Sequence, residues 1–81
     1  MEKEKTFKNL DAQVMEVEQW ILTNSGRSPE EVVVSALAKC GDNEEMAATR
    51  LVEEKIVQQT ADVPDPRVVA MAMIEKYALK L

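Results

Sequence analysis

Apolar residues recur at helical spacing in four segments of the chain. In the first segment the steps are four, three and four residues, through Leu10, Val14, Val17 and Ile21. Such steps place side chains on one face of an α-helix. Residues 1–8 alternate in charge and are expected to be a flexible end. The pattern predicts one all-α domain, a small four-helix orthogonal bundle, with helices at about residues 10–23, 29–40, 43–59 and 66–80.

Residues that stop and start helices separate these segments. Gly26 and Gly41 fall where the first two helices should end, since glycine tolerates the left-handed conformation of a helix C-terminus. Ser28, followed by Pro29 and then Glu31, has the pattern of a capping box. Two further start signals predict the remaining helices: Asp42 or Asn43, either of which can cap the third helix, and Asp65 before Pro66.

The last predicted helix is apolar around almost its whole circumference. Residues 68–74 form a run of seven apolar residues, and Tyr77 and Leu79 extend it. A helix without a polar face is either central to its fold or covered by something else. We interpret Met71 and Met73 as core residues, and the alternative is that their flexible side chains form an adaptable partner surface.

Composition narrows the possible chemistry. The chain has 81 residues, no histidine and one cysteine, Cys40. Without imidazole there is no histidine general base, no Ser-His-Asp triad and no histidine metal ligand. Cys40 sits near a helix C-terminus, where the helix dipole opposes a thiolate. We therefore expect a protein that is not an enzyme, with no catalytic residues and no cofactor.

The acidic residues favour helix termini over a metal site. They lack the spaced ligands of a calcium-binding loop, and each pair suits a helix start or a solvated surface. No metal site is predicted. As an alternative function, the acidic side chains could form one face that occupies a basic site on another protein: Glu30, Glu31, Glu44, Glu45, Glu53 and Glu54.

Charge and hydropathy argue against nucleic acid and membranes as direct partners. The net charge is -5, and residues 9–62 carry eleven acidic against four basic residues. A phosphate-binding surface should be basic. No window approaches the ~20 apolar residues that cross a bilayer. A lone cysteine gives no sign of an oxidising compartment, so we expect a cytoplasmic protein.

The favoured function is a noncatalytic protein interaction module that docks a partner through helical surfaces. The alternative is a small acidic regulatory or inhibitory protein, for example a phage-encoded one. The C-terminal helix could also pair with its copy in a homo-oligomer. The candidate partner-binding residues are Trp20, Gly26, Arg27, Val68, Met71, Ala72, Glu75, Tyr77 and Leu79.

The stretch from Glu30 to Val52 resembles the second and third helices of ubiquitin-associated (UBA-like) domains. The family pattern of an Ala-Leu pair, a short turn, and an Ala and a Leu on the next helix is matched by Ala36-Leu37, Gly41-Asp42-Asn43, Ala47 and Leu51. The resemblance covers about residues 10–55 and implies a three-helix portion that docks proteins. In the loop that contacts ubiquitin in that family, only Gly26 matches, so ubiquitin is not the expected partner.

Overall fold

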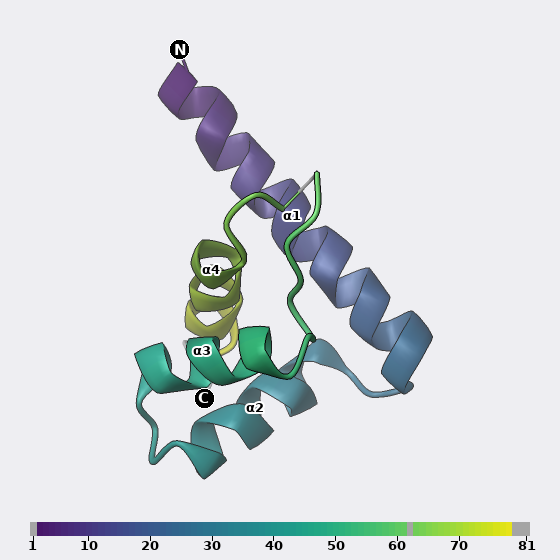
Figure 1. The fold of residues 1–81 in the computed structure, drawn as a ribbon, viewed down its shortest axis with the longest axis vertical. Helices are drawn as coiled ribbons and strands as arrows, with labels where there is room; N and C mark the ends of the chain where they lie inside the picture. The colour runs from purple at the N-terminus through teal and green to yellow at the C-terminus, as the bar shows by residue number, and fades with distance from the viewer. Residues whose placement is uncertain (1, 62, 79–81) are drawn as a thin grey trace.

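The computed structural model describes residues 2–61 and 63–78, with side chains described from Leu10 onward. These residues form four helices, which confirms the predicted all-α bundle (Figure 1). The helices are α1 (Glu2–Ser25), α2 (Pro29–Lys39), α3 (Glu44–Glu53) and α4 (Pro66–Ala78). Residues 79 and 80, predicted to end the last helix, lie outside the described residues.

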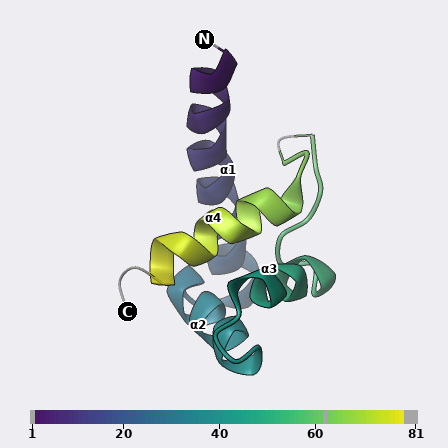
Figure 2. The ribbon, with the colours of Figure 1, turned by 90° about the vertical axis from the view of Figure 1, so that its left-hand side faces the viewer.

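Helix α4 is the centre of the fold. It crosses the middle of the molecule and packs against α1, α2 and α3 in the described part of the chain (Figure 2). Its inner face is fully buried through Val69, Ala70, Met73 and Ile74. One of the two uses predicted for an all-apolar helix is therefore realised, because this face of α4 forms the core.

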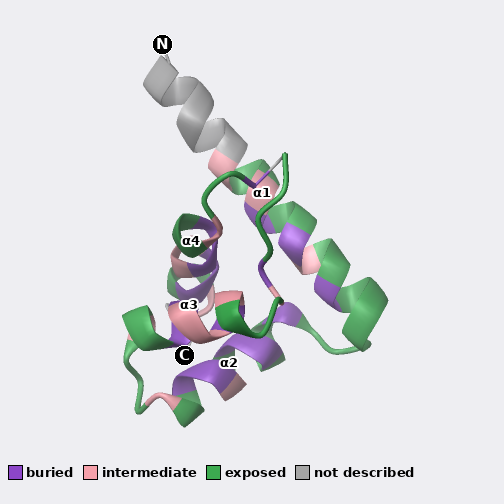
Figure 3. Ribbon diagram, in the orientation of Figure 1, coloured by how far each residue is buried: buried purple, intermediate pink, exposed green. Residues whose placement is uncertain are grey.

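The core is apolar throughout the described residues, and no polar or charged side chain is buried in it. The buried residues, drawn in purple, lie on the sides of the helices that face one another (Figure 3). α1 contributes Val14, Val17 and Ile21, the stripe that the sequence predicts. Ala47 and Ala48 are fully buried on α3, where small side chains let neighbouring helices approach closely.

Helix α1 is longer than predicted, and the predicted start near residue 10 is corrected to Glu2. The helix therefore continues through residues 2–8, for which a flexible end is predicted. Glutamate and lysine are good helix formers, so these residues can extend a helix without any apolar stripe. The N-terminal end of α1 projects beyond the other three helices (Figures 1 and 2).

Helix α3 is shorter than predicted and ends at Glu53 instead of residue 59. Lys55 adopts a left-handed conformation with φ of 63°. The Ile56 N–H donates to the Leu51 carbonyl at 3.0 Å, and the Lys55 N–H donates to Val52 at 3.0 Å. This pair of bonds is a Schellman motif, which closes a helix and turns the chain away. Residues 56–59 therefore continue as an irregular segment.

Three predicted helix starts are present. Ser28 Oγ accepts from the Glu31 N–H at 3.1 Å, and Asn43 Oδ1 accepts from the Met46 N–H at 3.0 Å. Asn43, and not Asp42, is thus the cap of α3. Asp65 Oδ1 accepts from the Val68 N–H at 3.4 Å, next to Pro66 at the first position of α4.

Candidate protein-docking surface

The outer face of α4 borders an open groove beside α1. Four of the predicted partner-binding residues lie together here, at positions i, i+3, i+4 and i+7 of α4: Val68, Met71, Ala72 and Glu75. The groove has a volume of about 470 Å³. Its lining residues are Leu10 from α1 with Asp65, Arg67, Val68, Met71, Ala72 and Glu75. We call this surface the α4 groove.

The two faces of α4 differ in exposure. Val68 is 49% exposed, whereas its neighbour Val69 is completely buried. Met71 and Ala72 are half-buried and pack against the edge of the core. An apolar ridge of this kind, with a small residue in it, offers the i, i+3, i+4 and i+7 contacts through which helices pack on one another.

Charged side chains stand at both ends of the α4 groove. Arg67 lies at the start of α4, and Glu75 lies about two turns further on. Among the described residues, the three ion pairs are Arg27–Glu31, Arg50–Glu54 and Lys76–Glu18. Arg67 and Glu75 therefore have no ion-pair partner within that part of the chain. A bound segment could supply one at each end.

Tyr77 has a structural role between α1 and α4. Its hydroxyl donates to Glu18 Oε2, which also accepts from Lys76 Nζ at 2.9 Å. The pKa of Tyr77 is raised to about 12, first by burial, then by its hydrogen bond to Glu18, and then by the negative charges of Glu18 and Glu30. These contacts direct the Tyr77 hydroxyl towards α1. The residue thus lies apart from the α4 groove.

Trp20 lies at a second, smaller pocket on another side of α1. Trp20 is 40% exposed, so it is not a core residue. The pocket has a volume of about 130 Å³ and lies between α1 and the irregular segment after α3. Its lining residues are Glu16, Val17, Trp20, Ile56, Gln58, Thr60 and Val63. We call it the Trp20 pocket.

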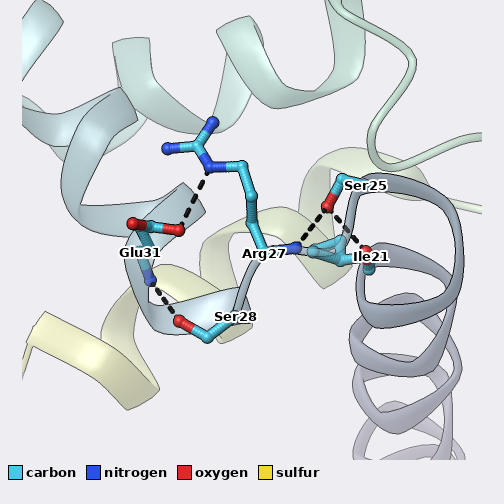
Figure 4. A network of polar contacts seen from close by, with 5 residues as sticks. All are labelled: Ile21, Ser25, Arg27, Ser28 and Glu31. Carbon is cyan, nitrogen blue, oxygen red and sulfur yellow. Dashed lines mark hydrogen bonds and ion pairs between the residues drawn. The ribbon is translucent and has the colours of Figure 1, made fainter.

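Gly26 and Arg27 form the turn between α1 and α2 (Figure 4). Gly26 has φ of 68°, the left-handed conformation expected of a helix C-terminus. The Arg27 N–H donates to Ser25 Oγ at 3.2 Å, and Arg27 Nε pairs with Glu31 Oε1 at 3.2 Å. Glu31 thus faces Arg27, in place of the predicted reach back to the Ser28 amide. Arg27 thus makes its contacts within the turn and the first turn of α2.

The six glutamates of the alternative acidic face lie at three helix ends. Glu30 and Glu31 are in the first turn of α2, Glu44 and Glu45 begin α3, and the third pair ends α3. Glu31 and Glu54 each pair with an arginine one helical turn away.

Within the described residues, no group of three or more His, Cys, Asp or Glu side chains could hold a metal ion.

Several lining residues were not among the sequence candidates. Leu10 begins the apolar stripe of α1, yet nothing in the sequence says that this end of the stripe meets α4. Ile56, Gln58, Thr60 and Val63 line the Trp20 pocket because α3 ends early. Leu79, the remaining candidate, lies outside the described residues.

Comparisons with known proteins give no match. No protein-family model, curated protein or solved structure matches this chain. Over the described residues, no helix combines the length and apolar character needed to cross a membrane.

Proposed function

We propose that this chain is a noncatalytic protein-docking module and that its α4 groove binds an amphipathic helix of a partner protein. The observation that carries the proposal is the two-faced character of α4. Its inner residues build the core, while Val68, Met71 and Ala72 present an apolar ridge to an open groove. A helix laid into such a groove buries apolar area on both sides, which is the main favourable term in association.

The charges at the groove ends define the expected partner further. A helix lying along α4 would place an acidic side chain near Arg67 and a basic side chain near Glu75. Such pairs fix orientation and register more than they add affinity. Methionine at position 71 suits the role, since its flexible thioether adapts to partner side chains.

The resemblance to UBA-like domains agrees with this proposal in class of function. We propose that α1, α2 and α3 correspond to the three helices of that family and that α4 is an addition. The short turn between α2 and α3, in which Gly41 and Asp42 both have positive φ, supports this proposal. The proposed docking surface is on the added helix and does not depend on the family's own binding loop.

Site-specific photo-crosslinking tests the proposal. A photoreactive residue at position 68 should capture one protein from the native source, and the crosslinked peptide should be an amphipathic helix. Position 34 is the matched control, because Val34 is an exposed valine on α2 with 37% exposure. The synthetic peptide should then bind the intact chain, and Val68→Asp should weaken that binding by about tenfold or more.

Three outcomes would overturn the proposal. The first is equal capture at positions 34 and 68. The second is a captured peptide whose binding survives Val68→Asp. The third is a second copy of this chain as the captured species, which would make the α4 groove a self-association surface. Sedimentation at two concentrations would then confirm a dimer, the arrangement that the C-terminal helix also allows.

A further inference from the structure

We propose that the Trp20 pocket is a second recognition site, which takes one leucine-sized aliphatic side chain from a peptide segment with basic residues beside it. The proposal is independent of the α4 groove. The pocket has an apolar floor of Val17, Trp20, Ile56 and Val63, and a polar rim of Glu16, Gln58 and Thr60. An apolar floor with a polar rim is the usual anatomy of a side-chain anchor site.

The wall of the pocket is held in place before any ligand binds. Val57 is fully buried and Val63 almost so, and both belong to the core. Between them, the Thr60 and Val63 backbones exchange hydrogen bonds at 3.0 and 3.1 Å, and Thr60 Oγ1 also accepts from the Val63 N–H. A preformed wall lowers the entropic cost of binding.

The size of the pocket selects one side chain. A volume of about 130 Å³ is close to the ~150 Å³ of an engineered apolar protein cavity that binds benzene. It can therefore accept a leucine, isoleucine or methionine side chain, but not a helix face. Trp20 forms part of the pocket with 40% of its surface exposed, and such tryptophans are typical anchors in protein interfaces.

The negative charge near the pocket favours basic residues next to the anchoring side chain in the peptide. Glu16 is exposed on the rim and makes none of the ion pairs found in the described residues. Residues 9–62, which supply six of the seven lining residues, have an excess of seven acidic residues over basic ones. Lysine or arginine next to the anchoring side chain would meet this field, whereas aspartate or glutamate would be repelled.

Trp20 is the only tryptophan of the chain, so its fluorescence reports on this pocket directly. The probe is the blocked pentapeptide Gly-Lys-Leu-Arg-Gly, titrated into the full chain. We expect a saturable change in Trp20 emission with a Kd of roughly 0.1 to 1 mM, as suits a single anchoring side chain. Replacing the peptide leucine with alanine should weaken binding about tenfold.

Two chain variants separate charge recognition from general electrostatics. Glu16→Gln should reduce the preference for the basic peptide over Gly-Glu-Leu-Glu-Gly by about threefold or more. Glu45→Gln, which removes the same formal charge from an exposed residue in the first turn of α3, should leave that preference unchanged. Amide chemical shifts should move at Ile56, Thr60 and Val63 and remain constant along residues 68–75.

Any one of four results would overturn the proposal. The first is the absence of a saturable fluorescence change up to about 10 mM peptide, and the second is equal affinity for the leucine and alanine peptides. The third is an equal effect of the two glutamate variants, and the fourth is chemical-shift changes confined to α4. None of them contradicts the proposal for the α4 groove, whose test uses other positions and another ligand.

Discussion

The Tyr77 hydroxyl of α4 donates a hydrogen bond to the Glu18 carboxylate of α1 across a sequence separation of 59 residues. The Glu18 side chain is 13% exposed, and it also forms an ion pair with Lys76. The interaction joins the first helix to the last. It holds together the two helices that form the α4 groove.

Tyr77→Phe should destabilise the fold without changing its shape. The substitution removes a hydrogen bond to a charged acceptor at a partly buried position, which is worth about 1 to 2 kcal/mol in the free energy of unfolding. Urea denaturation followed by circular dichroism measures this loss. Lys76→Met is the control, because a half-exposed ion pair contributes at most about 1 kcal/mol. A loss with Lys76→Met that exceeds the loss with Tyr77→Phe would contradict this assignment.

The same tyrosine should make stability depend on pH in the alkaline range. Its pKa in the folded chain is about 12, above the ordinary value of 10.0, so the folded state holds the phenolic proton more tightly than the unfolded state. The corresponding stabilisation is fully present below pH 10 and is lost as the pH rises towards 12. Tyr77→Phe should flatten this part of the profile relative to the parent chain. Equal alkaline losses in both proteins would contradict the role of Tyr77.

The two methionines of α4 should differ sharply in their effect on folding. Met73 is fully buried, whereas Met71 is half-buried on the edge of the α4 groove. Met73→Ala should cost about 2 to 5 kcal/mol of unfolding free energy because it leaves a cavity in the core. Met71→Ala should cost less than about 1 kcal/mol. Equal costs, measured by urea denaturation, would show that α4 is not two-faced.

Much of this fold follows from local sequence signals. The apolar stripe of α1, the caps Ser28 and Asp65, and the left-handed Gly26 all occur where the sequence predicts them. Each depends on residues within one or two helical turns, so periodicity and capping rules are sufficient. The central place of α4 is one of the two arrangements that its apolar circumference predicts.

The features that the sequence does not reveal depend on distant contacts or on an atypical residue. Leu10 and Val68 line one groove only because α1 and α4 cross. The sequence does not reveal that α3 ends at Glu53, because apolar residues continue at Ile56 and Val57 and lysine at position 55 is not a residue that typically ends a helix. Tertiary burial of Val57 outweighs the local preference for helix there. The Trp20 pocket could not be predicted without this early end.

The binding of a helical partner in the α4 groove should depend only weakly on salt. Four of the seven lining residues are apolar, and the charged ones, Asp65, Arg67 and Glu75, carry both signs, so raising the ionic strength removes only small attractions. The affinity of the captured peptide should change by less than about threefold between low and high salt. An acidic inhibitor of a basic site would instead lose affinity steeply. Isothermal titration at two salt concentrations measures the difference, and a steep loss would favour that alternative.

Lys55→Gly should stabilise the protein, although it removes a charged side chain. Lys55 has φ of 63°, a conformation that is costly for residues with a Cβ atom and free of that cost for glycine. The side chain is exposed, and Lys55 makes its Schellman bond through the backbone N–H, which glycine retains. The gain in unfolding free energy should be about 0.5 to 1 kcal/mol, measured by urea denaturation. Lys55→Ala keeps the Cβ atom and should give no gain. If both variants stabilise the protein equally, removal of the charge and not relief of backbone strain is the cause.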